Sequence, residues 1–167
     1  MGGSTQPIYR AFASIDKVID ATVRAAAEIA LTYSKEADDP ESSFLAIGLG
    51  YLSFSRAEPN LFRLLITHGR ASWSPASKNW PLHGLTGKMR EDPFLSGLSE
   101  AGLRTLLRDM FIYTHGLSSL AGPAPTETEL QEERELLRYV GGRLMVLAAL
   151  EESGEFRLDE FARRFHT

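Results

Sequence analysis

The stretch that decides the fold is residues 103–121, which read LRTLLRDMFIYTHGLSSLA. Apolar residues recur in it at steps of three and four, the spacing that places side chains on one face of an α-helix. These residues are Leu103, Leu107, Met110, Phe111, Leu117 and Leu120. Leu106, Ile112 and Tyr113 widen the apolar surface beyond the stripe of a simple surface helix. The sequence therefore predicts a central helix that contacts its own subunit on one side and either a second subunit or a ligand cavity on the other.

Length and composition narrow the class of protein. A chain of 167 residues is long enough for one domain with its own hydrophobic core. The absence of cysteine excludes disulfides, thiolate zinc sites and cysteine nucleophiles. A net charge of -4 argues against sequence-independent binding of nucleic acid by the chain as a whole. Without a membrane-length apolar run or a secretory signal, we expect a cytoplasmic protein with no membrane partner.

Helical periodicity also dominates the rest of the chain, so the predicted fold class is all-α. We expect helices over residues 15–33, 41–56, 60–68, 126–150 and 155–166. The buried stripe of the first helix is predicted at Ile15, Val18, Ile19, Val23, Ala26, Ile29 and Ala30. Glycine, proline and tryptophan punctuate residues 69–93, which we interpret as a partly ordered flap with a short helix at 85–89.

The helix after Thr126 carries a separate apolar seam. Thr126 and Glu129 form a capping-box pattern at its start. Leucine and valine then recur at near-heptad steps from Leu130 to Leu147, interrupted by a glycine pair at 141–142. The two glycines either lower the stability of the helix to a degree that the fold tolerates, or allow another helix to approach closely.

A monomer would leave this seam and part of the central helix in water, which predicts a homodimer through a four-helix bundle. The predicted interface consists of Leu117, Leu120, Leu137, Val140, Gly141, Leu144 and Leu147. Such an interface should bury at least ~1,200 Å². Leu144→Glu is expected to convert the dimer to a monomer or an aggregate, because it places unpaired charges near the axis.

Motifs of catalysis and metal binding are absent from the sequence. There is no phosphate-binding loop, dinucleotide fingerprint, zinc-protease motif or nucleophile elbow, and no two histidines have metal-ligand spacing. We expect Glu132, Glu133 and Glu135 to lie on an exposed helix surface. The sequence therefore predicts neither an enzyme nor a metal site nor a cofactor.

Aromatic residues are candidates for the lining of an apolar ligand cavity, although the same set would also describe a core. The candidates are Phe44, Tyr51, Phe54, Phe62, Trp73, Phe111 and Tyr113. His115 joins them as a polar group that either hydrogen-bonds a ligand or is satisfied by a neighbour. Gly116 beside it would let another element approach.

Three separated segments resemble the tetracycline-repressor (TetR) family of bacterial transcription regulators. STQPIYRAFASID, residues 4–16, is similar to the family's recognition helix and serine-capped linking helix. YLSFSRAEPNLFRLLI, residues 51–66, and RDMFIYTHGLSSLAG, residues 108–122, resemble its ligand-domain helices. The matches occur in the family's order and cover nearly all of the chain except the flap and the extreme C-terminus.

The resemblance implies a TetR-like helical bundle with three parts. These are a partial helix-turn-helix over residues 1–13, a linking helix over 14–35, and a ligand-binding and dimerisation domain over 36–167. It places five residues on operator DNA: Ser4, Thr5, Gln6, Tyr9 and Arg10.

The implied function is transcriptional regulation, as a repressor that senses a small apolar effector. The family has two further helices before the recognition helix, so we expect operator binding only where those helices are present. DNA binding by the chain as given is expected to be weak in a mobility assay. The alternative is a helical ligand-binding or interaction module without a DNA role.

Overall fold

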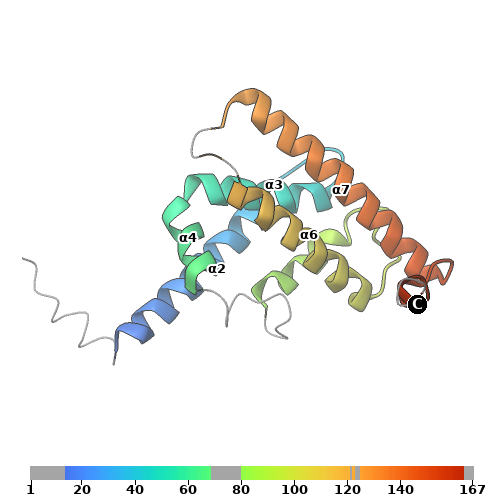
Figure 1. Ribbon diagram of the computed structural model, residues 1–167, viewed down its shortest axis with the longest axis horizontal. Helices are drawn as coiled ribbons and strands as arrows, with labels where there is room; N and C mark the ends of the chain where they lie inside the picture. Colours follow the sequence, from blue (N-terminus) through green and yellow to red (C-terminus); the bar gives the residue numbers. More distant parts are fainter. Residues whose placement is uncertain (1–13, 69–79, 121, 123–124, 164–167) are drawn as a thin grey trace, which may run out of the picture.

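The regular elements are all helices in the part of the chain that its structure, a computed structural model, describes. The described residues are 14–68, 80–120, 122 and 125–163. Their elements are α2 (Ile15–Glu36), α3 (Ser43–Ala57), α4 (Pro59–His68), η1 (Pro81–Leu85), α5 (Thr86–Met89), α6 (Glu100–Leu120), α7 (Glu127–Ser153) and α8 (Leu158–Arg163) (Figure 1). No β-strand occurs among the described residues, which confirms the all-α class.

The central helix predicted from the sequence is α6. It packs against both α3 and α7, and its inner face is fully buried at Leu103. Its other side remains in solvent, where Ile112 is 58% and Leu120 87% exposed. The buried inner face is confirmed, except at Leu120, which the sequence placed on that face and which is exposed at the end of the helix.

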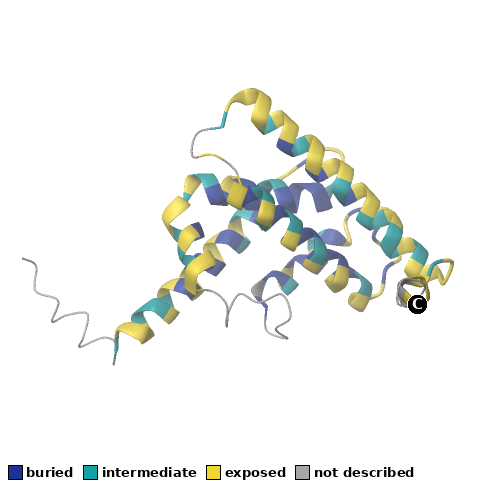
Figure 2. Cartoon of the chain, viewed as in Figure 1, coloured by how far each residue is buried: buried dark blue, intermediate teal, exposed yellow. Residues whose placement is uncertain are grey.

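Helix α2 packs on α3 and α4 through small side chains. Ala26 and Ala30 are completely buried, and the close approach of α3 occurs at Gly50. The predicted stripe is wrong at two positions, because Ile15 is 56% and Ile29 36% exposed. The first turns of α2 extend beyond the other helices, so they have little to pack against (Figures 1 and 2).

Helix α7 runs across α3 and α6 (Figure 1). The predicted capping box is confirmed, since the Thr126 hydroxyl accepts from the Glu129 N–H and the Glu129 carboxylate accepts from the Thr126 N–H. The exposed position predicted for Glu133 is wrong. Its side chain is buried because it forms an ion pair with Arg56 of α3.

The segment before α6 contains the short helix predicted at 85–89, here α5, and is otherwise more regular than predicted. Residues 80–93 form η1, α5 and a run of turns, and the side chains of Trp80, Leu85 and Met89 are almost completely buried against the helices. Burial of these apolar side chains explains why the second half of the predicted flap is ordered. Residues 69–79, including Trp73, lie outside the described part.

The last described element, α8, is a short helix. It spans Leu158–Arg163, inside the predicted range 155–166, and the rings of Phe156 and Phe161 lie 5.9 Å apart. Across the described residues, none of the helices combines the length and the apolar character that crossing a membrane requires.

Candidate ligand-binding site

Five predicted cavity residues meet in one aromatic cluster between α3, α4 and α6. They are Tyr51, Phe54, Phe62, Phe111 and His115. Their rings contact one another in edge-to-face and tilted pairs, with centroids 5.3 Å apart for Tyr51 and Phe111 and 6.4 Å apart for Phe54 and Phe62. Such packing fills much of the space between these rings, and a void of about 20 Å³ lies beside Tyr51 and Phe111. Tyr51, Phe54, Phe62 and Phe111 belong to the hydrophobic core, whereas His115 is half-buried and Tyr113 packs half-buried against the same core.

His115 has a partner within the cluster. Its Nδ1 lies 2.8 Å from the hydroxyl oxygen of Tyr51. Burial lowers the pKa of His115 below its ordinary value of 6.5, because the charged imidazolium is poorly solvated there. The hydrogen bond supports a structural role for His115. Among the described residues, no element lies within 4 Å of a Cβ built at Gly116.

The shift at His115 predicts how stability depends on pH. A histidine whose pKa is lower in the folded than in the unfolded state binds fewer protons when folded, so the free energy of unfolding falls as pH drops below about 6.5. His115→Gln should flatten this fall between about pH 8 and pH 5 in urea unfolding curves. The control His68→Gln, at an exposed position, should retain it. Equal slopes for wild type and His115→Gln would refute the assignment.

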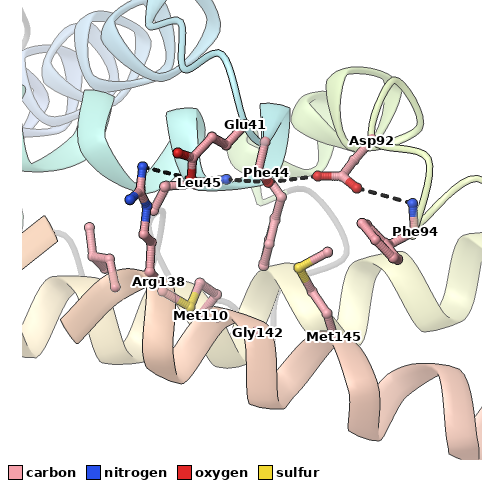
Figure 3. A pocket seen from close by; sticks show the side chains of 13 residues that line it. Glu41, Phe44, Leu45, Asp92, Phe94, Met110, Arg138, Gly142 and Met145 are labelled. Atoms are coloured by element: carbon pink, nitrogen blue, oxygen red, sulfur yellow. Dashed lines mark hydrogen bonds and ion pairs between the residues drawn. The ribbon is translucent and has the colours of Figure 1, made fainter. Parts of the chain in front are cut away.

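A larger cavity lies between α3, α6 and α7. Its volume is about 210 Å³, and we refer to it as the α3–α6–α7 cavity (Figure 3). The lining residues are Glu41, Ser42, Phe44, Leu45, Gly48, Asp92, Phe94, Met110, Leu137, Arg138, Gly141, Gly142 and Met145. Among the aromatic residues predicted from the sequence, Phe44 is the one that lines it.

Small and flexible side chains keep this cavity open. The Phe44 ring projects between the thioethers of Met110 and Met145 (Figure 3). A Cβ at Gly141 would lie 3.7 Å from the Met110 methyl and 3.9 Å from the Phe44 ring, so glycine leaves room on the α7 wall. Methionine adapts readily to irregular contents, which suits a binding cavity.

The polar rim of the cavity has two ends. At one end Asp92, only 2% exposed, accepts hydrogen bonds from the Ser42 hydroxyl at 2.6 Å and the Phe94 N–H at 3.1 Å. At the other end the Arg138 guanidinium pairs with Glu41 at 2.8 Å (Figure 3). The cavity is thus an apolar space with a buried carboxylate at one end and a neutralised arginine at the other.

A second cavity of about 250 Å³ lies between α3 and the start of α7. Polar and charged side chains make up much of its wall, among them Arg56, Gln131 and Arg134. Such a wall suits water better than an apolar ligand. We therefore take the α3–α6–α7 cavity as the candidate site.

Among the described residues, the outward face of α7 exposes several large apolar side chains to solvent. Tyr139 is 59% and Val146 61% exposed, and Leu136 lies beside them. The Arg143 guanidinium stacks 4.5 Å above the Tyr139 ring. Val140 and Leu147, both predicted at the dimer interface, are half-buried near this outward face.

The predicted dimer seam is wrong at two positions. Leu137 is completely buried and Gly141 is buried against Met110 and Phe44, so neither can contribute area to an interface. Leu144 and Leu117 are half-buried against the protomer's own core. The exposed apolar residues of α7 instead each lie one position before a residue of the predicted seam, at Leu136, Tyr139 and Val146.

The remaining predicted residues cannot be placed. Ser4, Thr5, Gln6, Tyr9 and Arg10, which the resemblance assigns to DNA, lie outside the described residues, as does Trp73. Within the described part, histidines and carboxylates form no group of three suited to a metal ion.

Sequence reasoning missed Asp92, Met110 and Met145 as cavity residues. Met110 was assigned to the helical core, and Asp92 fell in the supposed flap. The available signal for Asp92 was its position before Pro93, where aspartate side chains commonly accept a backbone N–H.

Comparison with known proteins identifies no relative. No family model matches the sequence, and the searches found neither a similar curated protein nor a similar solved structure.

Proposed function

We propose that the chain is a TetR-like transcriptional regulator, acting as a repressor, whose C-terminal domain senses a small apolar ligand and forms a homodimer. The DNA-binding part of the proposal rests on the sequence resemblance of residues 4–16. The sensing and dimerisation parts draw support from the geometry of α7.

The observation that carries the proposal is the arrangement of α7. One side of this helix lines the α3–α6–α7 cavity through Gly141, Gly142 and Met145. Another side exposes Tyr139 and Val146 to solvent. A ligand that enters the cavity therefore contacts the same helix that offers an apolar surface to a second copy.

This arrangement supplies a physical route from ligand to dimer. Ion pairs hold α7 to the segment before α3, where Asp39 accepts from Arg134 at 2.9 Å and Glu41 pairs with Arg138. A ligand that pushes on Met145 or Phe44 would shift α7 relative to α3 and so change the geometry of the dimer. Recognition of a two-fold operator depends on the spacing of two recognition helices, ~34 Å apart, so such a shift would alter operator affinity.

A ligand-binding module without a DNA role is the second candidate, because the cavity itself requires no DNA-binding part. The two candidates differ in whether the native protein binds DNA in the cells that produce it.

The test is chromatin immunoprecipitation of the native protein from the cells that produce it. A regulator should enrich a small number of genomic sites that share a two-fold symmetric sequence. The two half-sites of that sequence should lie about one turn of the DNA helix apart. A control precipitation from cells lacking the gene defines the background. Absence of any enriched site above that background would reject the regulator and favour the module.

A further inference from the structure

We propose that the ligand of the α3–α6–α7 cavity is a small apolar amine whose protonated nitrogen binds the carboxylate of Asp92. This inference deepens the ligand-sensing part of the proposed function by naming the chemical class of the ligand. It concerns this cavity alone and requires no DNA.

The first observation is the buried carboxylate of Asp92. The side chain is 2% exposed and lines the cavity, yet its hydrogen-bond donors are the Ser42 hydroxyl and the Phe94 N–H, both neutral. Among the described residues no lysine or arginine forms an ion pair with it. A buried carboxylate without a cation is costly, and a cationic ligand would offset that cost.

Asp39 provides an internal comparison. It is buried to a similar degree, at 6% exposed, and it also accepts backbone N–H groups, from Glu41 and Ser42. Unlike Asp92, it pairs with Arg134 at 2.9 Å, and Arg138 lies 4.0 Å away. The fold therefore supplies arginines to the buried aspartate outside the cavity and none to the one that lines it.

The second observation is the apolar wall opposite Asp92. Phe44, Leu45, Met110, Leu137 and Met145 give this part of the cavity an apolar surface. An apolar cavity of ~150 Å³ holds a benzene molecule, so about 210 Å³ suits a ring with a short chain. The fitting ligand is an arylalkylamine or a branched alkylamine of roughly ten non-hydrogen atoms.

An anionic ligand fits this cavity less well. The cation on the rim is Arg138, and its guanidinium already contacts Glu41 at 2.8 Å and lies 4.0 Å from Asp39. A carboxylate entering the cavity would compete with both of these groups and would also meet Asp92. Charge complementarity therefore favours a cation.

The test compares three probes that share one apolar group. Isothermal titration calorimetry of the full chain at pH 7 would measure 2-phenylethylamine, which is cationic, 2-phenylethanol, which is neutral, and 3-phenylpropanoate, which is anionic. We expect the amine to bind at least about tenfold more tightly than the alcohol, and the anion to bind most weakly. Equal affinity of amine and alcohol, or preference for the anion, would overturn the proposal.

Two variants locate the charge. Asp92→Asn keeps an acceptor for the Phe94 N–H and should reduce amine affinity about tenfold, to the level of the alcohol, with little effect on the alcohol itself. Glu91→Gln removes the same charge from the exposed residue next to Asp92, which does not line the cavity, and should bind the amine as the wild type does. Unchanged amine affinity in Asp92→Asn, or its loss in Glu91→Gln, would show that Asp92 is not the partner.

These outcomes are separable from those of the DNA experiment. Amine binding in solution without enriched genomic sites would leave the ligand class standing and reject the regulator. Enriched genomic sites without a preference for the amine would support the regulator and reject the proposed ligand class. Because the probe comparison uses the wild-type chain, it holds even if Asp92→Asn folds poorly.

Discussion

Gly50→Ala should lower the free energy of unfolding by about 3 kcal/mol, because it forces two helices apart. A Cβ at position 50 would lie 2.4 Å from the carbonyl oxygen of Tyr33 and 2.7 Å from the Cα of Ser34. Both atoms belong to the backbone of α2, so no side-chain rotation relieves the clash. The packing of α2 on α3 must shift as a whole, and the completely buried alanines of α2 would lose contacts with it.

The matched control is Gly142→Ala. Gly142 is also a helix-interior glycine, but a Cβ there has no atom within 4 Å. Alanine should therefore stabilise α7 by up to about 1 kcal/mol through its higher helix propensity. Urea unfolding followed by circular dichroism would measure both variants. Similar midpoints for Gly50→Ala and Gly142→Ala would show that α2 and α3 do not approach as described.

Val146→Glu and Tyr139→Glu should each weaken the proposed dimer about thirtyfold or more, the effect of losing about 2 kcal/mol at an interface hot spot. Both side chains are mostly exposed in the protomer, so a charge there costs the isolated fold little. In a dimer built on this face of α7, the added carboxylate would lose its water, and that desolvation cost would oppose pairing even with Arg143 nearby. We choose these two substitutions instead of Leu144→Glu as the test of the dimer, because Leu144 packs against the core of its own chain.

The control for these variants is Gln131→Glu. It adds the same charge to α7, but at an exposed position that faces the polar cavity beside α3. Size-exclusion chromatography with light scattering at micromolar concentration would compare the masses. Loss of the dimer in Gln131→Glu, or its persistence in both glutamate variants of the outward face, would place the interface elsewhere.

The helices were predictable because their apolar residues recur with the helical period. Residues 103–121 correspond closely to α6, and Thr126 starts α7 as its capping pattern predicts. Periodicity identifies the apolar face of a helix but not what covers it. For this reason Leu137 and Gly141 were assigned to a second subunit, whereas α3 and α6 of the same protomer cover them.

The candidate site was predictable only in its place beside the central helix. Large rings such as Phe54 and Phe62 pack edge to face and fill the space they share. The cavity opens where Gly141 and Met110 leave room, and its charge comes from Asp92. Sequence spacing does not show that the segment after α5 brings this aspartate against α3, so the carboxylate could not be placed in advance.

The central claim is that α7 joins a ligand cavity to a dimer surface. Sedimentation equilibrium of the wild-type chain at micromolar concentration tests it most directly. We predict a species of twice the 18.5 kDa chain mass, formed through the outward face of α7 that carries Tyr139 and Val146. A single 18.5 kDa species that persists to about 100 μM, where an interface worth roughly 6 kcal/mol would already pair the chains, would contradict the claim.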